Sequence, residues 1–266
     1  MVGTEDTPGL PLLRTRTSYG LVQRRMNKGG TAIGAFVLCG GLGTRLRSVV
    51  SDRPKSMALV AGVPFLEILL RQLRDQGVRE VVLGTGYMAD QIEKYFGDGK
   101  ILGLALRYSR ETEPLGTGGA VKLAERSLGD PTLVINGDSY VDYDLAAMES
   151  TRARTDAALV MMLQSVPDVS RYGSVKIERD GRVKEFVEKG KLTGPGLINA
   201  GVYLLRKGVL AALPPGKPVS LEREIFPGLL REKVYGLVSN GIFVDIGIPA
   251  DLERAQTLLG PRASDS

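Results

Sequence analysis

The sequence predicts an α/β protein with a Rossmann-like, doubly wound sheet of mainly parallel strands and a smaller β-rich extension. Between residues 32 and 137, short apolar runs alternate with amphipathic segments, and such βαβ repeats build parallel sheets covered by helices. After residue 155, strand-like runs follow one another closely, which predicts the extension. In sheets of this kind, ligands bind at the carboxyl ends of the strands.

Strands and helices are predicted to alternate along the first half of the chain. Apolar runs predict the strands, and leucines spaced three or four positions apart predict a helix that ends at Gly77. The predicted strands are 32–39, 80–86, 104–109 and 131–137, and the predicted helices are 64–77, 89–96 and 118–128.

The second half supplies further strands and two helices. Asp180 and Gly181 form a hairpin turn signal between two of the strands. Ser220 is expected to cap the first helix, and Pro249 to occupy the first turn of the second. The predicted strands are 156–166, 173–178, 182–189 and 198–205, and the predicted helices are 220–230 and 249–259.

Length and composition favour one main domain. The chain has 266 residues, of which 43% are hydrophobic and 24% charged, as in globular proteins. We expect a flexible leader over 1–30, the domain over 31–260 and a flexible tail over 261–266; whether Met1 or Met26 is the natural start stays open. No apolar stretch reaches the roughly 18 residues of a membrane span, so we expect a cytoplasmic protein with no membrane partner.

The residue types exclude several kinds of chemistry. The chain has no histidine, which excludes Ser-His-Asp and Cys-His catalysis and imidazole metal ligands. The net charge is +5, but residues 1–30 hold five basic and two acidic residues, a balance of +3. The remainder therefore carries about +2, and we expect no nucleic-acid partner. Cys39, the single cysteine, ends an apolar run, which predicts a buried, unreactive thiol.

A glycine-rich, cationic segment, GGLGTRLRSVVSDRPKSM over 40–57, follows the first predicted strand. Glycines let backbone N–H groups approach an anion closely, so we expect this segment to bind phosphate. It is not a P-loop, because no glycine precedes Lys55. It is not a dinucleotide fingerprint either, because Leu46 stands where the last glycine would be needed.

The run G-G-x-G-T-R-L, with P-K at 54–55, resembles the signature loop of the sugar-1-phosphate nucleotidylyltransferases. The resemblance continues through EPLGTGGA, VINGDSY, EFVEK, INAGVY and FVDIGIP and covers about residues 32–258. It implies a loop around a nucleoside triphosphate, with Arg45 and Lys55 as catalytic cations. The nucleotide-binding residues that it implies are Gly40, Gly41, Gly43, Thr44, Glu111, Gly116 and Thr117. The sugar-phosphate contacts that it implies are Glu188, Lys189, Asn199 and Gly201.

The resemblance also implies Mg²⁺ as cofactor, held by Asp138 and Asp245, and carboxylate oxygens suit this ion. The expected reaction joins a nucleoside triphosphate and a sugar 1-phosphate to give a nucleotide sugar and pyrophosphate. A sugar phosphate with a second pKa of about 6 is already ionised near neutral pH and needs no general base, which agrees with the absence of histidine. Each residue also has a structural alternative: the aspartates as turn caps, and Glu188 with Lys189 as a solvated pair.

Departures from the commoner family pattern indicate which group within the family the chain most resembles. PKSM replaces PKPM, and DIGIP replaces D-x-G-T-P, which most resembles the D-glycero-D-manno-heptose 1-phosphate guanylyltransferases. GTP and heptose 1-phosphate are therefore favoured, with Glu111 accepting hydrogens from guanine, although adenine or cytosine amino groups also fit a carboxylate.

Several alternatives stay open. Mannose, glucose or an amino-sugar 1-phosphate and another nucleoside triphosphate are alternative substrates on the same scaffold. A catalytically silent partner that binds nucleotide sugar is a different class of function. A metal-dependent glycosyltransferase is a third, because residues 142–144 read D-x-D. A homo-oligomer is compatible with the sequence.

Overall fold

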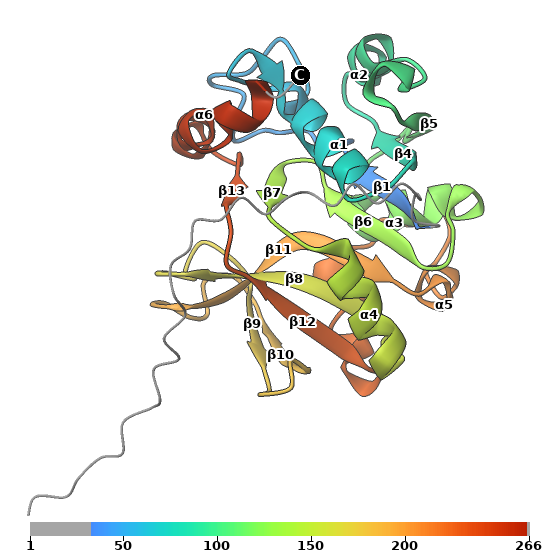
Figure 1. Ribbon diagram of the computed structural model, residues 1–266, viewed down its shortest axis with the longest axis vertical. Helices are drawn as coiled ribbons and strands as arrows, with labels where there is room; N and C mark the ends of the chain where they lie inside the picture. Colours follow the sequence, from blue (N-terminus) through green and yellow to red (C-terminus); the bar gives the residue numbers. More distant parts are fainter. Residues whose placement is uncertain (1–32, 265–266) are drawn as a thin grey trace, which may run out of the picture.

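The computed structural model describes residues 33–264, so the predicted leader lies outside the described residues. Its centre is a nine-stranded mixed sheet, with the order β10-β9-β11-β6-β1-β4-β5 and with β8 joining β11 to β12 (Figure 1). The strands of this sheet are β1 (Gly34–Leu38), β4 (Glu80–Thr85), β5 (Ala105–Arg110), β6 (Thr132–Asn136), β8 (Leu159–Val166), β9 (Ser174–Ile177), β10 (Val183–Val187), β11 (Gly196–Leu205) and β12 (Val234–Ser239).

Parallel pairing dominates the first half of the sheet. Strands β6, β1, β4 and β5 run parallel to one another, whereas β11 runs antiparallel to its neighbours. The predicted doubly wound sheet with a β-rich extension is therefore confirmed. Two small sheets complete the strands: β2 (Leu59–Val60) with β3 (Val63–Pro64), and β7 (Ser139–Val141) with β13 (Phe243–Asp245).

Helices cover both faces of the sheet, because each buries an apolar stripe against it. On one face, α1, α2, α4 and α6 contribute to the larger core cluster, whereas α3 and α5 contribute to the cluster on the other face. The helices are α1 (Phe65–Asp75), α2 (Ala89–Phe96), α3 (Gly116–Ala124), α4 (Leu145–Thr155), α5 (Lys207–Ala211) and α6 (Pro249–Ser264). Short helical turns are η1 (Lys55–Met57), η2 (Lys100–Leu102), η3 (Glu125–Ser127), η4 (Leu221–Ile225) and η5 (Gly228–Arg231).

The single helix predicted over 220–230 is wrong. The segment forms a π-helical turn, η4, followed by the 3-10 turn η5. Ser220 does cap the first turn, since its hydroxyl accepts a hydrogen bond from the Arg223 N–H. Pro227 has no N–H to donate, which prevents an uninterrupted α-helix from running through this segment.

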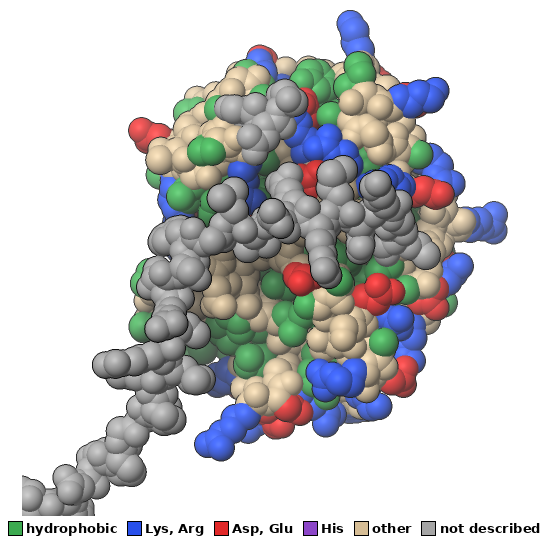
Figure 2. Space-filling view, in the orientation of Figure 1, with side chains coloured by type: hydrophobic (Ala, Val, Ile, Leu, Met, Phe, Trp, Pro, Cys, Tyr) green, Lys and Arg blue, Asp and Glu red, His purple; other side chains and the backbone are tan. Residues whose placement is uncertain are grey.

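Helix α6 begins at Pro249, as predicted, and continues to Ser264. It therefore includes part of the segment that the sequence analysis assigned to a tail. None of the helices in residues 33–264 is long and apolar enough to span a membrane. Basic and acidic side chains are interspersed over the face of the molecule in Figure 2, rather than separated by sign.

Candidate active site

A cavity of about 390 Å³ lies at the carboxyl ends of β1 and β6. This is the edge where ligands bind in open α/β sheets. Its lining comes from the glycine-rich loop after β1, the loop before α3, and the residues after β6. The lining residues are Leu38, Cys39, Gly40, Gly41, Leu42, Gly43, Thr44, Arg45, Lys55, Ser56, Glu111, Pro114, Gly116, Thr117, Ala120, Asn136, Gly137, Asp138 and Gly247.

The loop after β1 is anchored by one apolar side chain. Leu46 is 1% exposed, and its N–H donates to the Gly43 carbonyl, which closes a turn. Gly43 has a φ of +60°, a region that glycine enters without steric cost. A Cβ at Gly43 would lie 2.9 Å from the Lys55 Cβ, so this glycine also makes room for the lysine.

Lys55 lies between the two aspartates that the resemblance implied as metal ligands. Its Nζ is 2.6 Å from Asp138 Oδ2 and 3.9 Å from Asp245 Oδ1. Asp138 follows β6, and Asp245 ends β13, which pairs with β7 so that Asp245 lies opposite Ser139. Residues far apart in the sequence thus form one charged cluster at the cavity.

The surroundings of Asp245 disfavour its ionised form. Burial, followed by the negative charge of Asp138, raises the pKa of Asp245 above its ordinary value, and the charge of Lys55, the Gly247 backbone N–H and the charge of Arg45 oppose this shift. The Oδ1 atom of Asp245 is buried and accepts no hydrogen bond within the described part of the chain. A buried acceptor without a donor is costly, so this oxygen is available to a ligand.

Arg45 approaches the same cluster from the glycine-rich loop. Its side chain is exposed, but a Cβ placed on Gly247 would lie 3.5 Å from Arg45 Nη2 and 2.9 Å from Asp245 Oδ1. The guanidinium and the Asp245 carboxylate therefore both lie close to Gly247. Arg45 and Lys55, two of the four cations of this loop, therefore both act on the Asp245 carboxylate.

Thr117, expected at the nucleotide, is engaged within the protein. Its hydroxyl donates to Glu222 Oε2 at 2.7 Å and accepts from the Leu221 N–H at 2.8 Å. Gly116 has a φ of +69°, and a Cβ there would lie 2.6 Å from the Val219 carbonyl oxygen. The second glycine-rich loop thus packs closely on the segment before η4, in addition to lining the cavity.

Glu222 is a residue that the sequence analysis missed. Besides Thr117, it accepts hydrogen bonds from the Ser220 hydroxyl and, at 3.2 Å, from the Tyr203 hydroxyl. Tyr203 in turn accepts one from Asn199 Nδ2 at 2.8 Å. Glu222 therefore connects the loop expected at the nucleotide to the strand expected at the sugar. Its position, 105 residues from Thr117 in sequence, gave no signal.

The four residues expected at the sugar phosphate lie in two places. Asn199 and Gly201 are on β11, and a Cβ at Gly201 would lie 2.8 Å from Nδ2 of Asn136, which lines the cavity. Glu188 and Lys189 are exposed just after β10. Glu188 pairs with Lys191 at 2.6 Å, and this hydrogen-bonded lysine lowers the pKa of Glu188. The structure does not bring this second pair to the described walls of the cavity.

Glu111 lies in the cavity wall where a base reader was expected. Burial raises its pKa, although its Oε2 accepts a hydrogen bond from the Leu115 N–H at 2.9 Å. Its Oε1 would lie 2.6 Å from a Cβ at Gly40, so glycine is required for the two loops to approach. One carboxylate oxygen is therefore fixed by the protein, and the other lies at the junction of the two loops.

Asn136 is a further polar residue in the wall of the cavity. Asn136 was not predicted from the sequence, although it precedes Asp138 by two residues. Its Oδ1 is buried without a hydrogen-bond donor in the described residues.

The D-x-D triplet and the cysteine have structural roles. Asp144 caps α4 through the Ala147 N–H, and Asp142 pairs with Arg262. Cys39 is 4% exposed, which confirms the predicted burial, and burial raises the pKa of its thiol, which disfavours the reactive thiolate.

Replacing Gly43 with alanine is expected to lower turnover about tenfold, because misplacing a reacting group by a fraction of an ångström is costly. The new Cβ would press on the Lys55 Cβ, and the positive φ costs about 1 kcal/mol of stability. Gly62→Ala is the matched control, since Gly62 also has a positive φ, +83°, but faces open space. Melting temperatures and kcat are measured for both variants. Equal kcat values in the two would contradict the steric role of Gly43.

Comparison with known proteins gives consistent results. The sequence pattern of the nucleotidyl transferase family matches residues 34–260. A D-glycero-alpha-D-manno-heptose 1-phosphate guanylyltransferase from Aneurinibacillus thermoaerophilus is 42% identical, over 84% of this chain and 96% of its own. A mannose-1-phosphate guanylyltransferase from Mycobacterium tuberculosis is 39% identical over 84% of this chain, which spans 63% of that relative. The crystal structure of HddC from Yersinia pseudotuberculosis complexed with GMP-PN is 37% identical with a TM-score of 0.74, covering 85% of this chain and 98% of that one.

Proposed function

The chain belongs to the nucleotidyl transferase family, and from that premise we propose that it joins GTP and a heptose 1-phosphate, giving GDP-heptose and pyrophosphate. That it is a sugar-1-phosphate nucleotidyltransferase follows from the family and the guanylyltransferase relatives. The observation that carries the proposal is the cluster of Lys55, Asp138 and Asp245 beside a cavity closed by two glycine-rich loops. We also propose a cytoplasmic location, where nucleoside triphosphates are available.

The reaction requires one substitution at phosphorus. An oxygen of the sugar phosphate forms a bond to the α-phosphorus, and the bond from that phosphorus to the oxygen bridging the β-phosphorus breaks. The electron pair leaves with pyrophosphate. Both reactants are anionic, so neutralisation of charge and alignment dominate the barrier.

We propose that two cations at the cavity, Lys55 and Arg45, perform that task. Lys55 is 12% exposed and fixed beside two carboxylates, so its charge is preorganised at the cavity wall. We assign Lys55 to the charge that develops around the α-phosphate and Arg45 to the departing pyrophosphate. The sugar phosphate is assigned to the side of Asn199 and Gly201, with Glu188 and Lys189 as its predicted further contacts.

Asp138 and Asp245 fit a magnesium ion. Both provide hard carboxylate oxygens beside the cavity, and Asp245 Oδ1 is buried without a hydrogen-bond donor in the described chain. No cluster of three or more acidic, cysteine or histidine ligands occurs within residues 33–264. Two carboxylates are sufficient for a Mg²⁺ site, because this ion is commonly bound by one or two carboxylates together with substrate phosphates and water. When bound, it supplies positive charge beside the phosphate oxygens.

The choice of heptose and guanine rests on the relatives. The heptose guanylyltransferase from A. thermoaerophilus is matched over 96% of its length, whereas the mannose relative is matched over 63%. The HddC structure was solved with GMP-PN. Glu111 lies at the cavity with one oxygen free of the Leu115 contact, which suits an acceptor for the N1 and N2 hydrogens of guanine.

We expect the highest kcat/KM with GTP and D-glycero-α-D-manno-heptose 1-phosphate. The assay measures pyrophosphate release for ATP, GTP, CTP, UTP and dTTP, each combined with heptose, mannose, glucose and amino-sugar 1-phosphates. A higher kcat/KM with mannose 1-phosphate would replace heptose by mannose in the proposal. Absence of release with every pair, together with nucleotide-sugar binding, would favour the silent regulatory partner.

A further inference from the structure

The two proposed metal ligands lie on a very short pair of strands. β7 and β13 pair over three residues, in which Asp245 lies opposite Ser139 and Phe243 lies opposite Val141. Asp138 immediately precedes β7, and the Ile246 N–H donates to its carbonyl at 2.9 Å. The separation of the two carboxylates therefore depends on the register of this pair.

So short a pair does not hold its own register. An isolated two-stranded ribbon is marginally stable in water, and a shift of one residue turns every side chain to the opposite face. Such a shift of β13 would point Asp245 away from Lys55 and Asp138. Contacts outside the pair must therefore fix its register.

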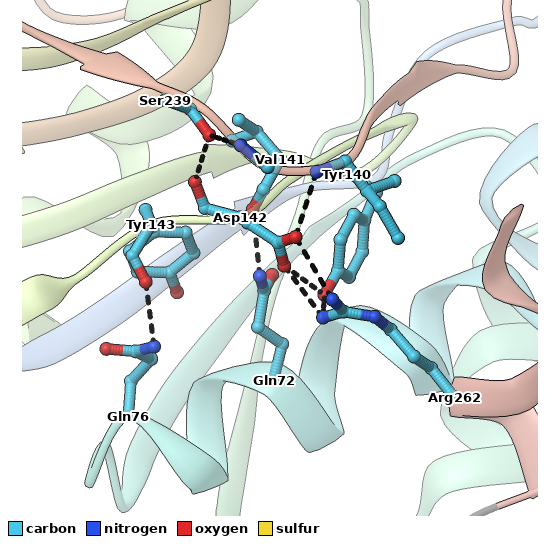
Figure 3. A network of polar contacts seen from close by, with 10 residues as sticks. Gln72, Gln76, Tyr140, Val141, Asp142, Tyr143, Ser239 and Arg262 are labelled. Carbon is cyan, nitrogen blue, oxygen red and sulfur yellow. Dashed lines mark hydrogen bonds and ion pairs between the residues drawn. The ribbon is translucent and has the colours of Figure 1, made fainter. Parts of the chain in front are cut away.

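The far end of the pair is fixed by Asp142 (Figure 3). Its Oδ2 accepts a hydrogen bond from the Ile242 N–H at 2.9 Å, while its own N–H donates to the Ile242 carbonyl at 2.9 Å. Its carbonyl accepts from the Ser239 hydroxyl at 2.6 Å, and that hydroxyl accepts from the Gly241 N–H. Asp142 thus forms hydrogen bonds to the chain that leads into β13 through both its backbone and its side chain.

Arg262 of α6 holds the Asp142 carboxylate with two nitrogens. Nη1 is 2.7 Å from Oδ1, and Nη2 is 3.0 Å from Oδ2. The same guanidinium donates to the Tyr140 hydroxyl and lies over the Tyr140 ring, 5.2 Å from its centroid. A bidentate pair of this kind fixes direction as well as distance. Figure 3 shows the guanidinium, the ring and the carboxylate converging on one point.

Two glutamines of helix α1 hold the same segment. Gln72 Nε2 donates to the Val141 carbonyl at 2.8 Å. Gln76 donates to the Tyr143 carbonyl and accepts from the Leu145 N–H. The two glutamines are four residues apart and so share one face of α1. The chain after β7 is therefore held by side chains of both α1 and α6, neither of which lines the catalytic cavity.

We propose that the ion pair between Asp142 and Arg262 positions the catalytic aspartates, by fixing the register of β7 and β13 and hence the separation of Asp138 from Asp245. The inference rests on the proposed role of these aspartates in holding the metal. Arg262 touches neither of them, so it is a positioning residue that acts through the strand pair.

The test is Arg262→Ala, with two readouts. The Mg²⁺ concentration that gives half-maximal pyrophosphate release is expected to rise about tenfold, the effect typical of losing a group that orients a metal ligand. Calorimetric binding of Mn²⁺ together with a non-hydrolysable GTP analogue is expected to weaken by the same factor. Asp142→Asn, which keeps the side-chain shape, is expected to shift both readouts in the same direction and serves if Arg262→Ala does not fold.

Gln256→Ala is the matched control on the same helix. Gln256 ties α6 to the β2–β3 hairpin, through the Leu59 carbonyl and the Ala61 N–H, so these hydrogen bonds do not involve β7 or β13. It is expected to lower the melting temperature without changing either metal readout. Unchanged metal readouts in folded Arg262→Ala or Asp142→Asn would overturn the positioning role alone. Absence of metal-dependent activity in the native protein would overturn the metal assignment and the inference with it.

Discussion

Replacing Lys55 with alanine is expected to lower kcat by two to three orders of magnitude, the effect of removing one preorganised charge donor. The Lys55 Nζ lies 2.6 Å from Asp138 and 3.9 Å from Asp245, at the wall of the cavity. Without it, the wall of the cavity beside the two carboxylates loses the side-chain cation that we assign to the α-phosphate. The barrier therefore rises through repulsion that is greatest when charge accumulates at phosphorus.

The measurement is pyrophosphate release at saturating substrates. Arg53→Ala is the control, because Arg53 lies in the same loop but pairs with the exposed Asp52; its kcat is expected to stay within about twofold of native, as for a surface pair. Circular dichroism establishes that both variants are folded. A folded Lys55→Ala enzyme with native turnover would remove Lys55 from the mechanism.

The sheet could be predicted because its strands are long apolar runs. β1, β4, β6 and β8 are each mostly buried, and their composition separates them from the amphipathic helices. β7 and β13 could not be predicted, since three residues carry no usable periodicity. Yet these two strands bring the aspartates together. The local pattern thus revealed most of the scaffold, β12 excepted, but not the strand pair on which the site depends.

Some residues of the candidate site could likewise be predicted from the sequence, and others could not. Residues in dense local motifs, such as Gly43, Lys55 and Asp138, could be predicted from the sequence, and the structure brings them to one cavity. Glu222 and Arg262 could not, because their partners are 105 and 120 residues away and isolated charged residues usually belong to the solvated surface. Side chains that orient others leave no local signature, and only the fold reveals them.

Replacing Asp245 with asparagine is expected to lower kcat about a hundredfold or more while leaving the fold as stable as before, or more stable. The loss follows from removing one of the two carboxylates proposed for the metal, a larger change than losing an outer-shell partner. The gain in stability follows from the raised pKa of Asp245, which arises from burial and from Asp138. A carboxyl whose pKa is raised by folding destabilises the folded state above that pKa, and an amide is neutral at every pH.

The variant therefore separates function from folding, because the two quantities move in opposite directions. Pyrophosphate release and melting temperature are measured at neutral pH, with Asp144→Asn as the control, since asparagine caps helix α4 as well as aspartate does. Excess chelator is expected to abolish release by the native enzyme. Native turnover in Asp245→Asn, or activity that persists in chelator, would show that the buried carboxylate serves no metal. A melting temperature below the assay temperature would explain the lost turnover by unfolding and would show instead that Asp245 is needed for folding. Only a slow enzyme with an unchanged or higher melting temperature fits a strained carboxylate kept for catalysis.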